Sequence, residues 1–234
     1  MYQPAHFRED RLDVQHALIR AHPFGLLVTS GASGLDANPV PFLLDAAASP
    51  LGTLRAHVAR ANPVWRDLEP SHEVMIVFQA VDSYVTPSWY ASKREHGKVV
   101  PTWNNAIVQA WGRPRTIEDA AWLGAQIRAL TTRHEAARAE PWAVDDAPAP
   151  FVATQIKAIV GIEIEITRIE GKWKASQNRP PAQPYETAEL SPMARTFYRD
   201  NRRVRNDRIK RELGVRLAYP SYREGLAALL PIDG

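Results

Sequence analysis

The sequence contains no cysteine among its 234 residues. This absence excludes disulfide bonds, cysteine nucleophiles and metal sites with cysteine ligands, and it fits a reducing compartment. Long apolar runs are missing as well, because none approaches the ~20 residues that a membrane-spanning helix requires. Residues 1–10 lack the apolar core of a signal peptide. We therefore expect a cytoplasmic protein that does not cross a membrane.

Several catalytic motifs are also missing. Neither a Walker loop nor the G-x-G-x-x-G fingerprint occurs, which argues against an internal nucleotide-binding α/β domain. The pairs His72-Glu73 and His134-Glu135 each lack the second histidine of a zinc-protease motif. The segment 31–34 does not have the spacing of a nucleophile elbow and predicts a hairpin turn. The sequence thus disfavours hydrolases and metalloenzymes, and we expect no metal site.

Positive charge is concentrated near the C-terminus. Residues 191–234 carry ten Lys or Arg and five Asp or Glu, whereas residues 1–190 carry nineteen and twenty-one. The net charge of the two parts is therefore +5 and −2. A basic segment of this kind can contact nucleic acid, but a solvated helical face rich in arginine is the commoner origin of such a pattern.

The apolar pattern predicts a mainly β (α+β) protein. Short apolar segments separated by turn residues indicate about seven antiparallel strands in a barrel or sandwich: 25–30, 35–45, 51–59, 73–80, 83–87, 98–117 (one long strand, or two broken at Pro101) and 161–176. Pro39 and Pro41 place the second strand at an edge or a bulge. Ile162, Ile164 and Ile166 alternate with polar residues, as in a half-buried strand. Glu170-Gly171 is interpreted as a turn into a final short strand.

Helices flank these strands. We predict helices over 10–21, 118–138 and 151–158, one helical turn over 62–68, and Thr116 as the N-cap of the second helix. The proline-rich stretch around 181–190 marks a linker. Residues 1–180 then form the main domain, and residues 191–234 form a short basic tail with a helical pattern.

Two segments have the composition of a ligand site. In the first, a strand that carries His57 leads into a helical turn that begins at Asn62, with Arg60 beside the free backbone N–H groups. An anion would meet a guanidinium, an amide and oriented backbone donors there. The alternative is that Asn62 only caps the turn and Arg60 is solvated.

The second segment is an aromatic wall formed by 84–90 and 98–104. Two tryptophans, two tyrosines and several hydroxyl groups fall within 21 residues, between prolines that hold the backbone extended. Planar ligands favour such walls, because aromatic faces stack while hydroxyl and amide groups bind the ring edges. A hydrophobic core or a dimer interface would have a similar composition.

These same segments carry a resemblance to a known family. Residues 83–112 (SYVTPSWYASKREHGKVVPTWNNAIVQAWG), 56–67, 38–45 and 160–179 resemble the PaiB-like FMN-binding negative transcriptional regulators, over about residues 1–180. The resemblance implies an FMN-binding split β-barrel, related to pyridoxamine-phosphate-oxidase-like flavin proteins, with FMN at the interface of a homodimer.

The resemblance also implies roles for individual residues. Arg60 and Asn62 become candidates for the flavin phosphate, with His57 close by. Ser88, Trp89 and Tyr90, with Lys93, would lie near the flavin ring or ribityl chain. Thr102, Trp103 and Asn104 would line the same pocket, in one reading from the neighbouring subunit.

The C-terminal residues 190–230 are similar to something else, the C-terminal tail of epimerase-like reductases of the extended short-chain type. The dinucleotide-binding domain of those enzymes is missing here. We therefore interpret the tail as a fused remnant or docking module, and we infer no reductase activity from it.

Three functions remain open from the sequence. The family name implies a flavin-binding transcriptional regulator, whose DNA contact would fall to the arginine-rich residues 199–211. A flavin-dependent oxidoreductase acting on a small molecule is an alternative, because the flavin itself supplies the redox chemistry and no catalytic triad is needed. A haem-binding split barrel is the third, with His57 or His96 as residues to test.

Overall fold

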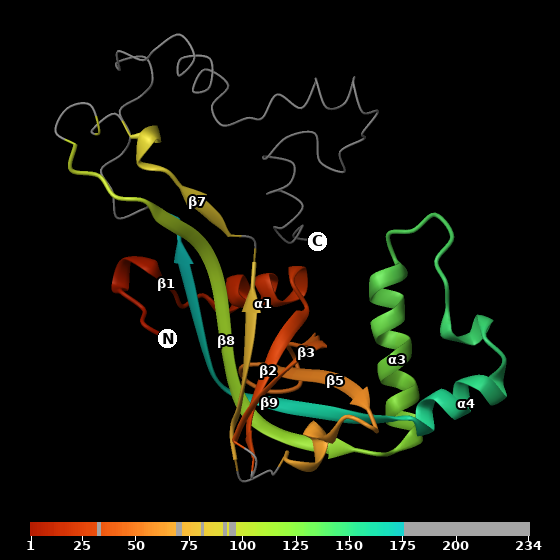
Figure 1. Ribbon diagram of the computed structural model, residues 1–234. Helices are drawn as coiled ribbons and strands as arrows, with labels where there is room; N and C mark the ends of the chain where they lie inside the picture. The colour runs from red at the N-terminus through yellow and green to blue at the C-terminus, as the bar shows by residue number, and fades with distance from the viewer. Residues whose placement is uncertain (32–33, 69–71, 81, 91–92, 94–96, 176–234) are drawn as a thin grey trace. The chain divides into compact units, whose positions relative to one another are not determined.

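The structure is a computed structural model that describes residues 1–31, 34–68, 72–80, 82–90, 93 and 97–175 (Figure 1). It divides into two compact units, one of residues 1–84 and 103–176, the other of residues 85–102 and 177–234. The predicted linker 181–190, the basic tail 191–234 and His96 lie outside the described residues.

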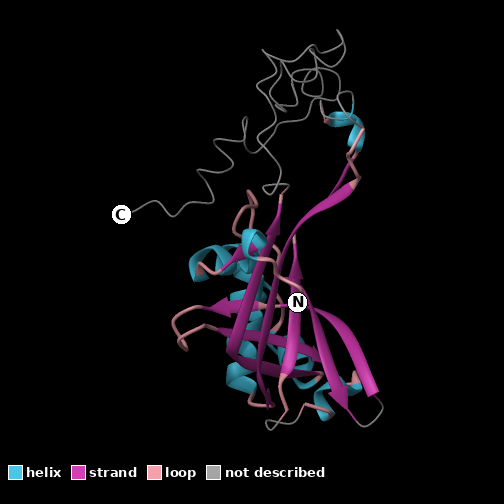
Figure 2. Ribbon diagram, turned by 90° about the vertical axis from the view of Figure 1, so that its left-hand side faces the viewer, coloured by secondary structure: helices cyan, strands magenta, loops and turns pink. Residues whose placement is uncertain are grey.

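Strands dominate the described chain, as predicted (Figure 2). The α-helices are α1 (Leu12–Ala21), α3 (Ala120–Glu135) and α4 (Ala149–Lys157). The strands are β1 (Arg8–Glu9), β2 (Phe24–Gly31), β3 (Gly34–Pro41), β4 (Leu43–Asp45), β5 (Thr53–Ala59), β6 (Val74–Gln79), β7 (Ser83–Val85), β8 (Thr102–Ile117) and β9 (Ile159–Lys174). Single 3-10 turns span Ala5–Phe7, Pro63–Arg66, Pro87–Trp89 and Val144–Asp146.

The strands form one antiparallel sheet in the order β3-β2-β6-β8-β9-β5-β4, with β1 added at β9 and β7 at β8. Strands β8 and β9 are each 16 residues long and pair from Asn105↔Lys174 to Ile117↔Gly161. The register shifts between Trp111 and Gly112, because their partners Arg168 and Ile166 leave Thr167 as the extra residue of a bulge in β9. A side chain at Gly112 would collide with the backbone oxygen of Glu165, so glycine permits this close approach.

The inner face of the sheet holds the hydrophobic core. Ile162, Ile164 and Ile166 of β9 are all buried in it, as their alternation predicts. Leu18 and Ile19 on one face of α1 complete the same core. Proline suits the ends of a sheet because it cannot donate a ladder hydrogen bond. The strand that contains Pro39 and Pro41 is accordingly the end strand β3.

Two local predictions were wrong. Thr116 lies within β8, and the N-cap of α3 is Asp119, whose carboxylate accepts the Trp122 N–H at 2.8 Å. Glu170 and Gly171 do not turn the chain, because β9 runs on to Lys174. Glycine at position 171 permits the close approach of the paired strand β1. A Cβ there would lie only 2.7 Å from the Glu9 backbone oxygen.

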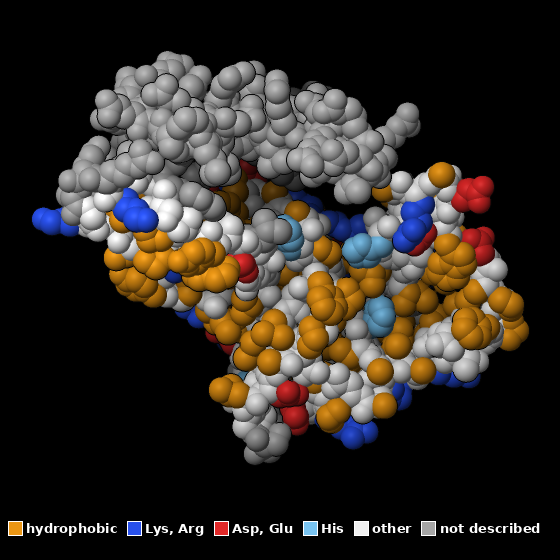
Figure 3. Space-filling model, turned by 45° about the horizontal axis from the view of Figure 1, so that its top comes forward, with side chains coloured by type: hydrophobic (Ala, Val, Ile, Leu, Met, Phe, Trp, Pro, Cys, Tyr) orange, Lys and Arg blue, Asp and Glu red, His pale blue; other side chains and the backbone are white. Residues whose placement is uncertain are grey.

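The outer face of the sheet has two different halves. Over β5 and the first part of β9 it is covered by α3, where Trp122 packs so closely on Gly161 that a Cβ there would collide with its ring. The outer face of β3, β2, β6 and β8 carries no such helix among the described residues and exposes apolar side chains, among them Phe24, Leu26 and Leu35. Figure 3 shows apolar side chains spread over much of the face in view.

No described helix is long and apolar enough to cross a lipid bilayer.

Candidate functional site

The turn after β5 joins two strands of the sheet through a pair of asparagines. Asn62 Oδ1 accepts the Val64 N–H at 3.0 Å, so this residue caps the 3-10 turn as predicted. Its Nδ2 also donates to Asn38 Oδ1 on the edge strand β3, at 2.9 Å. Asn38 was not singled out from the sequence, although both residues precede proline in the chain. The two side chains thus form a polar contact beside the apolar core.

Arg60 is partly exposed, and its guanidinium already has partners within the chain. Nε donates to the Lys157 oxygen at 2.9 Å, one terminal nitrogen donates to the Ile159 oxygen at 3.2 Å, and the other is paired with Glu118. Its backbone oxygen accepts the Trp65 indole N–H at 3.0 Å. An anion at Arg60 must therefore compete with the Glu118 carboxylate.

His57 lies on the outer face of β5, opposite Gly161 of β9. Burial lowers the pKa of its imidazole below the ordinary histidine value, which favours the neutral ring. Nδ1 is buried and has no hydrogen-bond partner among the described residues. A neutral imidazole with an unused nitrogen can accept or donate a proton, or ligate a metal.

In the second unit, a short polar segment follows β7. Thr86 Oγ1 accepts the Ser88 N–H at 3.3 Å and thereby caps the 3-10 turn Pro87–Trp89. The Lys93 ammonium donates to Ser88 Oγ at 3.1 Å, and the Tyr90 N–H donates to the Pro87 oxygen at 3.1 Å. The structure thus brings together three of the predicted residues, Ser88, Tyr90 and Lys93. The side chain of Trp89 lies outside what the structure describes.

The remaining predicted residues begin β8. Trp103 is half exposed and meets Tyr84 edge to face, with ring centroids 5.8 Å apart. Its backbone oxygen accepts the Lys174 ammonium at 2.9 Å. Thr102 and Asn104 flank it in the same strand and are partly buried. An exposed aromatic pair of this kind offers a face on which a planar ring can stack.

Most of the chain matches a known protein family. The model of a family described as "Putative FMN-binding domain" matches residues 1–168. The chain belongs to this FMN-binding family. The predicted cofactor, FMN, and the predicted family relationship are thereby confirmed.

Individual relatives agree with this assignment. An uncharacterized protein of Emericella nidulans is 36% identical over 212 residues, covering 76% of this chain and 84% of that protein. The protease synthase and sporulation protein PAI 2 of Bacillus subtilis is 28% identical over 179 residues, covering 76% and 83%. Among solved structures, the flavocytochrome Anf3 of Azotobacter vinelandii aligns with a TM-score of 0.53 at 14% identity, covering 82% of this chain and 75% of that chain. The likeness confirms the predicted split-barrel fold.

The residues present suit a phosphorylated planar cofactor. Amide, hydroxyl and ammonium groups bind phosphate and ribityl oxygens, and exposed aromatic rings bind a flat ring system. No group of three or more metal-ligating side chains occurs among the described residues. When bound, FMN would supply redox chemistry; the described side chains would hold and orient it.

Proposed function

We propose that this chain is a homodimeric FMN-binding protein that regulates transcription negatively. The homodimer is supported by the apolar half of the sheet's outer face, which no described helix covers. The regulatory role rests on the resemblance to the PaiB-like regulators over about residues 1–180, and on the basic C-terminal segment.

The dimer surface consists of outward-facing side chains in register on four neighbouring strands. Leu26 of β2 stands between Pro39 of β3 and Val77 of β6, and in the next row Val28 stands between Ala37 and Met75. A contiguous apolar surface that is rimmed by polar residues often marks an interaction site. A second copy of the chain would cover it with identical residues, as twofold symmetry requires.

One polar residue in this surface points to the same conclusion. Gln109 of β8 lies directly opposite Val77. Its side-chain oxygen is buried without a partner among the described residues. Buried polar atoms are normally hydrogen-bonded, so a second copy that donates a hydrogen bond to Gln109 would satisfy this atom.

For the cofactor, we propose two contact regions. The flavin phosphate would bind at the turn after β5, with Asn62, Arg60 and the nearby His57. The ring and ribityl chain would bind Ser88, Trp89, Tyr90 and Lys93, together with Thr102, Trp103 and Asn104. In this proposal Arg60 exchanges Glu118 for the phosphate when FMN binds.

The dimer is tested by Leu26→Arg, which places a charge in the apolar surface. We expect a monomer by light scattering and at least about tenfold weaker FMN binding, because an unpaired interface charge costs several times the thermal energy. Phe151→Arg is the matched control, since Phe151 is 56% exposed on α4, outside the dimer surface. A dimer that persists in Leu26→Arg would reject the proposed interface.

The regulatory role is tested with the full chain and a random pool of DNA duplexes. We expect repeated selection to enrich a sequence, with affinity that falls steeply as salt rises. Replacing Arg202, Arg203, Arg205 and Arg208 by glutamine would flatten this salt dependence if the basic segment contacts phosphates. If no sequence is enriched even at low salt, the regulatory role is wrong, while FMN binding would be unaffected.

A further inference from the structure

A chain of hydrogen bonds runs from the edge strand β3 to the turn after β5. Asp36 Oδ2 accepts from Asn38 Nδ2 at 2.9 Å, and Asn38 Oδ1 accepts from Asn62 Nδ2 at 2.9 Å. Asn62 Oδ1 in turn accepts the Val64 N–H at 3.0 Å. We call the three side chains of Asp36, Asn38 and Asn62 the polar relay.

The direction of these hydrogen bonds is fixed at the Asp36 end. A carboxylate only accepts hydrogen bonds, whereas a carboxamide carries an acceptor oxygen and a donor nitrogen. Asn38 therefore turns its Nδ2 toward Asp36, and this leaves its Oδ1 to face Asn62. If the Asn38 amide were reversed, two donor groups would face each other at Asn62 and the hydrogen bond between them would be lost.

The backbone also restricts the polar relay. Asn38 and Asn62 each precede a proline, whose ring limits the preceding residue to extended conformations. Asn62 accordingly has φ −72° and ψ 121°. The Asp36 carboxylate is held as well, because its Oδ1 accepts the Ala37 N–H at 2.8 Å. The three side chains therefore have less conformational freedom to lose when a ligand binds.

Asn62 belongs both to the polar relay and to the position proposed for the flavin phosphate. Its Nδ2 carries two hydrogens; one is donated to Asn38, and no described residue accepts the other. We infer that Asp36 and Asn38 are positioning residues that aim this second N–H at the phosphate, and that they make the chain prefer FMN to riboflavin. Both act through Asn62 and need not touch the flavin. Since the phosphate position is itself part of the proposed function, this role depends on it.

The sign of the effect separates this role of Asp36 from a simple effect of its charge. A carboxylate repels a nearby phosphate, so removal of the Asp36 charge alone would strengthen FMN binding. Asp36→Ala also removes the acceptor that orients Asn38, and we therefore expect it to weaken FMN binding. Asp36→Asn removes the charge but keeps an acceptor oxygen, so it should bind FMN at least as tightly as the original chain.

The test compares FMN with riboflavin, which lacks the phosphate, by fluorescence titration of the full chain. Asp36→Ala and Asn38→Ala should each weaken FMN about tenfold, as expected for the loss of one hydrogen bond to a charged group, and leave riboflavin affinity within about twofold of the original. Asp36 is exposed and Asn38 is half-buried, so neither change opens a cavity in the core. Light scattering checks that both variants keep the mass of the original protein.

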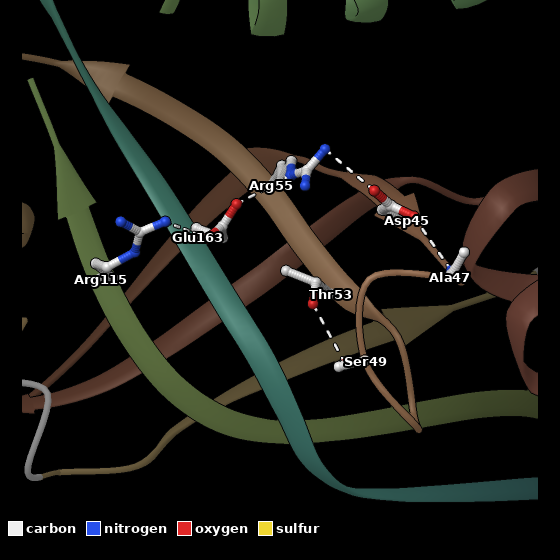
Figure 4. Close-up of polar contacts among 7 residues, drawn as sticks. All are labelled: Asp45, Ala47, Ser49, Thr53, Arg55, Arg115 and Glu163. Atoms are coloured by element: carbon white, nitrogen blue, oxygen red, sulfur yellow. Dashed lines mark hydrogen bonds and ion pairs between the residues drawn. The ribbon is translucent and has the colours of Figure 1, made fainter. Parts of the chain in front are cut away.

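The matched control is Asp45 on β4, the strand at the other end of the sheet (Figure 4). Its Oδ1 accepts the Ala47 N–H at 3.1 Å, much as Asp36 accepts the N–H of its own neighbour. Its Oδ2 pairs with Arg55 at 3.2 Å, and none of these partners belongs to the residues proposed for FMN. Asp45→Ala removes an edge-strand carboxylate in the same way, and it should change the affinity for neither flavin.

Two results would overturn the inference. In the first, the ratio of FMN to riboflavin affinity falls in Asn62→Ala but keeps its original value in Asp36→Ala and Asn38→Ala. In the second, these two variants lose both flavins equally, which would mean that the polar relay only stabilises the fold. If Asn62→Ala itself leaves the ratio unchanged, the proposed phosphate position is wrong and the role of Asp36 and Asn38 is rejected with it.

Discussion

The Asn62 amide donates to Asn38 Oδ1 at 2.9 Å, while its own Oδ1 accepts the Val64 N–H at 3.0 Å. One side chain thus fixes the turn after β5 and ties it to the edge strand β3. Because the two hydrogen bonds use different atoms of the amide, substitutions can remove them separately.

Asn62→Asp should keep the cap and lose the bond to Asn38, whereas Asn62→Ala loses both. We expect alanine to lower the free energy of unfolding by about 1 kcal/mol more than aspartate, which is the usual contribution of an N-cap. Both variants should bind FMN more weakly, aspartate because its charge repels the phosphate. Denaturant unfolding and flavin titration measure the two effects. Unchanged FMN affinity in both variants would remove Asn62 from the site.

Glu118→Gln tests whether Arg60 binds the flavin phosphate. The neutral amide competes less well for the guanidinium, so FMN affinity should rise severalfold while the bonds to Lys157 and Ile159 remain available. Arg60→Gln should weaken FMN in the same titration. If Glu118→Gln leaves the affinity unchanged and Arg60→Gln only lowers stability, the guanidinium is structural and takes no part in binding.

Gly161→Ala should destabilise the protein by about 1–3 kcal/mol, as overpacking typically does. The added methyl group would collide with the Trp122 ring, which anchors α3 on β9. Gly124→Ala within α3 is the matched control, since its Cβ would meet only the end of the half-exposed Arg128 side chain, at 3.1 Å. Helix propensity favours alanine there by about 1 kcal/mol. Thermal unfolding should therefore move in opposite directions for the two variants.

The stability of the protein should fall as pH is lowered through the histidine range. Burial lowers the pKa of both His57 and His16 in the folded state, so below the ordinary value of 6.5 the unfolded chain binds more protons than the folded chain. This contribution is fully present above that value and is lost as pH falls toward the lowered pKa. In His57→Gln the free energy of unfolding should depend less steeply on pH, because only the contribution of His16 remains. Denaturant unfolding at several pH values measures this dependence. If the free energy of unfolding changes with pH equally steeply in His57→Gln and in the original chain, the expectation is wrong.

Local patterns predicted much of the fold. The alternation of Ile162 to Ile166 indicated a strand with one buried face, and Pro39 and Pro41 indicated an edge strand; both were confirmed. The error at Thr116 arose because two local signals competed. Thr116 and Asp119 are both good N-caps, and the pairing of β8 with β9 through Ile117 decided in favour of Asp119.

The site was harder to predict, because its partners are distant in the chain. Glu118 pairs with Arg60 across 58 residues, and Asn38 meets Asn62 across 24. No periodicity encodes such contacts.

Titration of FMN with the freshly purified full chain, followed by flavin fluorescence and light scattering, tests the central claim most directly. The account predicts quenched fluorescence that saturates at one FMN per chain, on a particle with the mass of two chains. Flavin that keeps its full fluorescence in excess protein, on colourless material, would contradict it.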